Sequence, residues 1–122
     1  MILVDTSVWI DHFRQGDDCL VDLLRSGQVL THELVIGELA CGSLPDRANT
    51  LANLLALPRL PNLPFEETLL AIDRLKLSSI GIGFVDVSLL SAALVSPCVL
   101  WSRDKRLLSV VETLGISFQE FN

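Results

Sequence analysis

The chain has 122 residues and a formal net charge of −6, half of its residues are apolar, and its mean hydropathy is +0.50. A domain of this length buries roughly two-thirds of the surface of its unfolded form, so it needs neither disulfides nor a structural metal to hold a core. The acidic balance argues against non-specific binding to nucleic acid, although it leaves room for a site whose acids hold cations.

The first predicted element is a strand at residues 2–4, because Ile-Leu-Val is a short, continuous apolar run of the kind found in the middle of a parallel sheet. Residues 5–7 end this strand, and we expect a turn to follow them. Asp17 and Asp18 are suited to capping a helix rich in leucine, and Gly27 ends that helix.

The middle of the chain continues this alternation. A second short strand is predicted at residues 29–31, and residues 34–41 have helical spacing up to Gly42. Pro45 suits the first turn of a further leucine-rich helix.

An extended edge segment and an amphipathic helix come next. Residues 60–65 contain two prolines, which favour an extended segment at a sheet edge. Residues 66–77 have the spacing of an amphipathic helix. The side chains predicted to face inward are Leu69, Leu70, Ile72 and Leu75.

The last third contains a loop, two helices and two strands. Residues 78–83 include two glycines and are predicted as a loop, and residues 85–95 form a mostly apolar helix. Residues 98–101 have the apolar character of a fully buried strand. A helix at 104–114 and a short strand at 116–118 complete the chain.

This alternation of short apolar strands and helices predicts a single α/β domain spanning residues 1–122, a three-layer α/β/α sandwich with a central parallel sheet. In such folds, chemistry collects outside the carboxyl ends of the strands, where the strand order reverses. Asp5 directly follows the strand at 2–4, and Asp104 follows the strand at 98–101 after two residues. We therefore expect these two acids to meet at one end of the sheet.

Two further acids, Glu38 and Asp86, lie within helical stretches that have apolar neighbours. Burying an unpaired carboxylate in a core costs several kcal/mol of folding free energy. The nine lysines and arginines that could pair with these acids lie mostly in polar stretches. A divalent cation such as Mg²⁺ or Mn²⁺ would compensate, because hard ions take oxygen ligands. The alternative is that Asp5 and Asp104 cap turns while the other two acids face solvent, which explains each acid singly but not their joint placement.

The cysteines and the N-terminal residues predict a cytoplasmic location. The three cysteines are Cys19, Cys41 and Cys98. Each lies in an apolar stretch and none forms a C-x-x-C pair, so we expect buried thiols and no zinc site. Residues 1–4 meet Asp5 without a basic leader segment. The apolar stretch at 84–101 is interrupted by Asp86, which favours a buried helix and strand over a membrane span.

Four short motifs contain the four acids, and they fall in order along the whole chain. They are ILVDTSVWI at residues 2–10, GEL at 37–39, GIGFVD at 81–86 and LWSRDKRL at 100–107. Together they resemble the acidic motifs of PIN-domain proteins and, more narrowly, those of the VapC-type toxins of bacterial toxin–antitoxin pairs. The segment between Cys41 and Phe65 contains no motif that contributes to this resemblance.

The resemblance implies a Mg²⁺- or Mn²⁺-dependent endoribonuclease that is blocked by a cognate antitoxin and forms a homodimer. The residues that match the catalytic acids of the family are Asp5, Glu38, Asp86 and Asp104, of which Asp5, Asp86 and Asp104 are the expected metal ligands. The residues expected to orient these carboxylates, a water or the RNA are Thr6, Ser7, Ser102 and Arg103.

Three cations flank the last acid: Arg103, Lys105 and Arg106. They are suited to guiding an RNA backbone or to meeting the acids of a protein partner. A solvated helix start explains them equally well.

Two pairs of residues near these motifs have alternative interpretations. His12 and His32 are isolated from any catalytic partner, so a surface or capping role is the expectation for both. Trp9 and Phe13 follow the first acid at roughly helical spacing. They are either core residues or, if exposed, anchors for an apolar helix of an antitoxin.

Three other protein classes fit the sequence less well. A two-component receiver domain needs an acidic pair after the first strand, but Thr6 follows Asp5. A phosphatase with an aspartate nucleophile needs a second Asp where this chain has Ser7. A binding protein without catalysis would not need all four acids, and metal binding without RNA cleavage would distinguish it.

Overall fold

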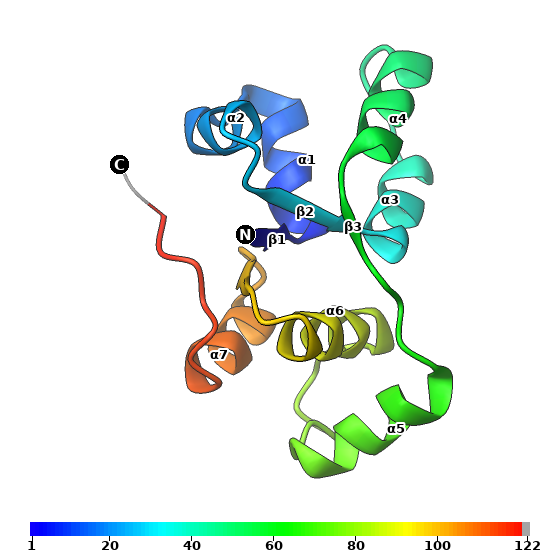
Figure 1. Ribbon diagram of the computed structural model, residues 1–122, viewed down its shortest axis with the longest axis vertical. Helices are drawn as coiled ribbons and strands as arrows, with labels where there is room; N and C mark the ends of the chain where they lie inside the picture. Colours follow the sequence, from blue (N-terminus) through cyan, green and yellow to red (C-terminus); the bar gives the residue numbers. More distant parts are fainter. Residues whose placement is uncertain (121–122) are drawn as a thin grey trace.

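The computed structural model describes residues 1–120 and contains a four-stranded parallel sheet between layers of helices, which confirms the predicted α/β/α sandwich. From edge to edge, the strands are β3 (Arg59–Leu60), β2 (Val29–His32), β1 (Ile2–Val4) and β4 (Val99–Trp101). The helices are α1 (Thr6–Gln15), α2 (Asp18–Arg25), α3 (Glu33–Ala40), α4 (Arg47–Ala56), α5 (Phe65–Arg74), α6 (Phe84–Val95) and α7 (Lys105–Thr113). Figure 1 shows α1 and α2 on one side of the sheet and α6 and α7 on the other.

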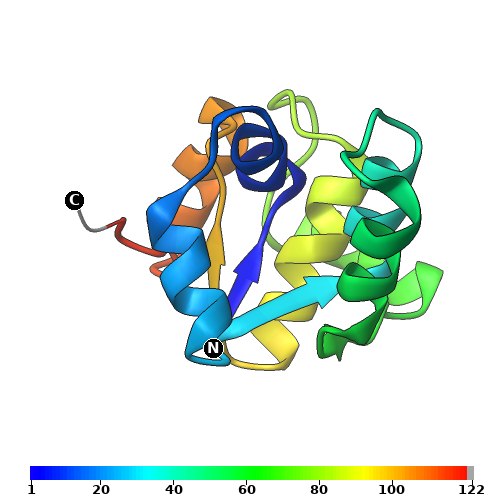
Figure 2. The same ribbon diagram turned by 90° about the horizontal axis from the view of Figure 1, so that it is seen from above.

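Strand β1 lies at the centre of the sheet, and all three of its residues are buried. It pairs in parallel with β2 on one side and with β4 on the other, as Figure 2 shows. The chain moves outward from β1 through β2 to β3 and then returns to the opposite side as β4, so the strand order reverses beside β1. Because Val4 pairs with Trp101, the residues that follow β1 and β4 emerge side by side.

Helix α1 begins immediately after β1, so the turn predicted after residue 7 was wrong. Asp5 occupies the N-cap position, but its side chain makes no capping hydrogen bond to the backbone; its Oδ2 atom instead accepts the hydroxyls of Ser7 and Ser102. Val8 and Trp9 face the core from the first turns of the helix. Residues 5–7 are Asp-Thr-Ser, which favour turns as well as helix starts, so the sequence alone did not distinguish the two.

Helix α5 exposes two leucines that the pattern assigns to the core. Leu69 is 43% exposed and Leu70 is 56% exposed, whereas Thr68 is 1% exposed. The apolar residues of α5 are spread around more than one side of the helix, so the sequence pattern alone allows more than one face to be the buried one. The helix packs against α6, where Phe65 and Phe84 are in contact, and one apolar strip is left uncovered.

Two predicted boundaries near helix ends also differ from the structure. Pro45 lies two residues before α4, and Asp46 occupies its N-cap with a φ of 45°. The strand predicted at 116–118 is reduced to a single parallel bridge between Leu100 and Ser117, because its only backbone hydrogen bonds to β4 go to Leu100, within residues 1–120. The other predicted helices and strands are confirmed to within a few residues.

The exposure of the cysteines follows the prediction only in part. Cys19 and Cys98 are half-buried, while Cys41 is exposed at the end of α3 and not buried as expected. In the part of the chain that the structure describes, no helix combines the length and apolar character needed to cross a bilayer.

Candidate active site

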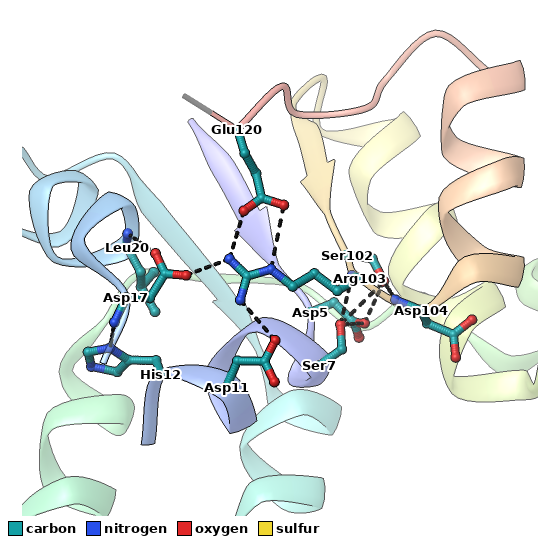
Figure 3. Close-up of polar contacts among 10 residues, drawn as sticks. All are labelled: Asp5, Ser7, Asp11, His12, Asp17, Leu20, Ser102, Arg103, Asp104 and Glu120. Atoms are coloured by element: carbon teal, nitrogen blue, oxygen red, sulfur yellow. Dashed lines mark hydrogen bonds and ion pairs between the residues drawn. The ribbon is translucent and has the colours of Figure 1, made fainter. Parts of the chain in front are cut away.

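Asp5 lies at the carboxyl end of β1 and is 6% exposed. Its Oδ2 atom accepts hydrogen bonds from the hydroxyl groups of Ser7 and Ser102, each at 2.8 Å. Figure 3 shows these two serines arriving from opposite ends of the chain, Ser7 on α1 and Ser102 just after β4. Two hydroxyl groups therefore fix one oxygen of a nearly buried carboxylate.

Asp104 is the N-cap of α7 and lies beside Asp5 in Figure 3. Its Oδ1 atom accepts hydrogen bonds from the backbone N–H groups of Arg106 and Leu107, both at 3.1 Å. The backbone N–H of Asp104 in turn donates to Ser102 Oγ. The capping role that the sequence left as an alternative is therefore real for this acid, and it occupies one of its two carboxylate oxygens.

Glu38 and Asp86 approach from the helices α3 and α6. Glu38 is exposed, and its Oε1 atom accepts a hydrogen bond of 2.7 Å from the hydroxyl of Thr6 at the start of α1. Asp86 is half-buried in the first turn of α6, and its Oδ2 atom accepts the backbone N–H of Gly83 at 3.1 Å. Like the other two acids, each has one oxygen fixed by a donor from the protein.

The four carboxylates act on one another electrostatically. Burial raises the pKa of Asp86, and the N–H of Gly83 opposes this shift. The negative charges of the other three acids raise the same pKa further. Like charges held close together in this way favour either a proton or a cation among them.

The donor set suits a hard divalent cation. The hydrogen bonds described above use Asp5 Oδ2, Glu38 Oε1, Asp86 Oδ2 and Asp104 Oδ1. Within residues 1–120, no three acidic, histidine or cysteine side chains converge tightly enough to form a finished metal site. Like charges on the four acids repel one another, and each acid keeps one carboxylate oxygen outside these hydrogen bonds. The second oxygen of each carboxylate offers the ligand chemistry that Mg²⁺ and Mn²⁺ prefer.

In Figure 3 the guanidinium of Arg103 points away from Asp5 and Asp104. It forms ion pairs with Asp11 at 2.9 Å, Asp17 at 2.5 Å and Glu120 at 2.7 Å, and it lies over the ring of Trp101. The hydrogen bonds to these carboxylates raise the pKa of Arg103. Only its backbone N–H reaches the site, where it donates to the Oγ of Ser7.

Arg106 supports the loop that leads into α6. Its Nη1 atom donates to the carbonyl of Gly81 at 3.3 Å. Gly81 has a φ of +87°, a conformation that favours glycine, and a Cβ atom there would lie 2.5 Å from that nitrogen, so the flexible Arg106 side chain would have to move. The loop ends at Gly83, whose N–H holds Asp86. Sequence reasoning identified the loop but not its link to Arg106.

Both histidines cap helical or turn backbone, as expected. His12 Nδ1 accepts the N–H of Asp17, and His32 Nδ1 accepts the N–H of Leu34 at the start of α3. Of the aromatic pair on α1, Trp9 is 3% exposed and belongs to the core. Phe13 stacks on it at a ring-centroid distance of 5.8 Å and is half-buried.

Comparisons with known proteins agree with this architecture. The model of the PIN domain family matches residues 2–112. The chain is 45% identical over 121 residues to a protein called ribonuclease VapC32 in two strains of Mycobacterium tuberculosis, covering 98% of both chains. It also resembles the crystal structure of PAE2754 from Pyrobaculum aerophilum, with a TM-score of 0.64, 21% identity and coverage of 93% of this chain and 90% of that one, a likeness of fold. The chain therefore belongs to the PIN-domain family, and within it to the VapC type.

Proposed function

We propose that this protein is a metal-dependent endoribonuclease and the toxin of a type II toxin–antitoxin pair, acting in the cytoplasm. Two observations support the proposal. A relative that is 45% identical over nearly the whole chain is called a ribonuclease. The single structural observation that carries the proposal is that four carboxylates at one end of the sheet each have one oxygen bound by the protein.

In this proposal, Asp5, Asp86 and Asp104 hold a Mg²⁺ or Mn²⁺ ion. When bound, such an ion supplies an activated water and steadies negative charge on the phosphate. Ser7 and Ser102 keep Asp5 oriented through its Oδ2 atom.

Glu38 has a different part in the reaction. Thr6 fixes its Oε1 atom, and its exposed side chain leaves the second oxygen to accept the proton of the attacking water. The reacting bond is a phosphodiester of RNA. Arg103 supports the site from behind, through its backbone N–H to Ser7 and its ion pairs, rather than by contacting the RNA.

We further propose that the antitoxin binds between α1 and α4. A cavity of about 210 Å³ lies there, and Trp9, Phe13, Leu24 and Leu54 are among its lining residues. An apolar segment of the antitoxin would cover Phe13, which is only half-buried in the free chain.

The proposed homodimer uses the uncovered face of α5 and α6. Its exposed apolar residues include Phe65, Leu69, Leu70 and Val95. An apolar surface of this kind on a small protein indicates a partner. We regard residues 1–122 as one domain, of which residues 121 and 122 lie outside the described part.

The test is cleavage of a mixed RNA pool by the purified, antitoxin-free protein, with and without Mg²⁺ or Mn²⁺. We expect cleavage that needs the metal, stops with EDTA and falls at least about 100-fold in Asp5→Asn, because this substitution removes a charged ligand from the ion. Circular dichroism would verify that the variant is folded. Equal cleavage by wild type and variant, or cleavage that EDTA does not affect, would contradict the proposal.

A further inference from the structure

A groove of about 480 Å³ runs between α7 and the turn that follows α5. Lys76, Lys105 and Arg106 line it together with the apolar side chains of Ile80 and Val110. The sequence contains only two lysines, and both line this groove. No aspartate or glutamate among residues 1–120 is part of its lining. In a protein with a net charge of −6, this concentration of positive charge is the opposite of the average surface.

The charges in the groove are available to a ligand. The ion pairs within residues 1–120 all belong to Arg103, so Lys76, Lys105 and Arg106 have no carboxylate partner there. Arg106 donates one side-chain hydrogen bond, to the carbonyl of Gly81, and this bond leaves its charge uncompensated. All three cationic side chains are exposed. Unpaired cations lining a concave surface favour a polyanionic ligand.

The groove and the carboxylate site share helix α7, whose first residues line the groove and whose N-cap is Asp104. Lys105 follows Asp104 in the sequence, and the backbone N–H of Arg106 donates to Asp104 Oδ1. Lys105 and Arg106 therefore lie next to one of the four acids, on the path that a strand leaving the site along α7 would follow. Ile80, which is 45% exposed, offers an apolar surface against which a ribose or base could pack.

We propose that this groove binds the backbone phosphates of single-stranded RNA on one side of the cleaved bond, with Lys76 and Lys105 as the main contacts. The inference rests on the proposed ribonuclease function and adds a substrate-binding surface to it. The groove lowers the dissociation constant for RNA by electrostatic attraction, and the affinity therefore falls as salt rises. It reads no sequence, because phosphates are the same along any strand.

The test is the binding of a fluorescently labelled single-stranded RNA, measured by anisotropy at several salt concentrations. Asp5→Asn is the background, so that the RNA stays intact. In that background we compare two double variants, Lys76→Ala/Lys105→Ala in the groove and Arg25→Ala/Arg59→Ala as the control, each of which removes two positive charges. Arg25, at the end of α2, and Arg59, in the edge strand β3, are both exposed and neither lines the groove.

The groove double variant is expected to bind at least about 10-fold more weakly near 0.1 M salt, and its log–log salt slope should be shallower by about 1.4, or 0.7 for each lost phosphate contact. The Arg25→Ala/Arg59→Ala control should match its parent in both quantities. Lys76→Arg with Lys105→Arg should restore the binding, which a variant that simply misfolds would not allow.

Two results would overturn the proposal. One is a double variant whose affinity and salt slope equal those of the control. The other is a double variant that binds RNA normally but loses affinity for the antitoxin, which would make the groove a protein-binding surface. Because binding is measured without cleavage, failure of the wild type to cut RNA would remove the proposed function while the anisotropy data still decide the fate of the groove.

Discussion

The charge on Asp86 suits the binding of a cation but lowers the stability of the metal-free fold. Burial and the three neighbouring acids raise its pKa in the folded state above the usual 3.8. A carboxyl group with a raised pKa stabilises the fold below its unfolded pKa, and that contribution is lost as pH rises through the folded pKa. At neutral pH and without a cation, the charge on Asp86 therefore weakens the fold.

We predict that Asp86→Asn raises the Tm of the metal-free protein by roughly 2–5 °C at pH 7.5. The amide oxygen can still accept the N–H of Gly83, so the start of α6 is preserved. Differential scanning calorimetry in EDTA would measure the change. Adding Mn²⁺ should raise the Tm of the wild type more than that of the variant, and a variant less stable than wild type in EDTA would contradict this prediction.

The sequence motif around Arg103 did not reveal which residues its side chain contacts. Its place beside Asp104 in the sequence suggested a contact with RNA, but its guanidinium is engaged by Asp11, Asp17 and Glu120. These partners come from α1, the start of α2 and the C-terminal segment, so their meeting depends on the tertiary fold. In contrast, the four acids could be proposed from the sequence because each belongs to a recognisable local motif.

At the element scale, α3 depends on a buried histidine for its first turn. His32 is fully buried, and its Nδ1 atom accepts the N–H of Leu34, which only the neutral imidazole can do. Burial lowers its pKa below the usual 6.5, and the charge of Glu33 opposes that shift. The folded state therefore binds fewer protons than the unfolded state, so stability is lost as pH falls below about 6.5 toward the folded pKa.

We predict that the free energy of unfolding, measured with urea, falls by up to about 1.4 kcal/mol per pH unit below pH 6.5 because of this one residue. His32→Asn keeps a capping side chain but does not titrate. The variant should be less stable at pH 7.5, because a smaller side chain fills the site, and should show a flatter dependence on pH. His12 is present in both proteins, so the difference between the two pH profiles isolates His32. Parallel profiles would contradict this assignment.

The most completely buried elements were the easiest to predict from the sequence. The runs that form β1 and β4 are short and apolar, and both were predicted to within a residue. Helix α1 was missed because Asp5, Thr6 and Ser7 are residue types that favour turns as well as helix starts. Two leucines of α5 were placed in the core because a pattern shows which residues are apolar, not whether another element covers them.

At the scale of the whole molecule, the position of the site follows from the order of the strands. Because β1 lies between β2 and β4, the acids that follow β1 and β4 emerge together, and the helices α3 and α6 bring Glu38 and Asp86 to the same end. This convergence could be anticipated from the alternation of strands and helices. The groove lined by both lysines could not, since Lys76 and Lys105 are far apart in the sequence and meet only in the folded chain.

The most direct measurement of the central claim is the binding of Mn²⁺ by calorimetric titration, made beside RNA cleavage on the same samples. The proteins to compare are the wild type and Asp5→Asn, Asp86→Asn, Asp104→Asn and the control Asp22→Asn, whose carboxylate is exposed on α2. We predict that each of the first three variants weakens Mn²⁺ binding by at least about 10-fold and lowers cleavage in parallel, while the control matches the wild type. Wild-type affinity and cleavage in all three variants would show that these carboxylates do not form the catalytic metal site.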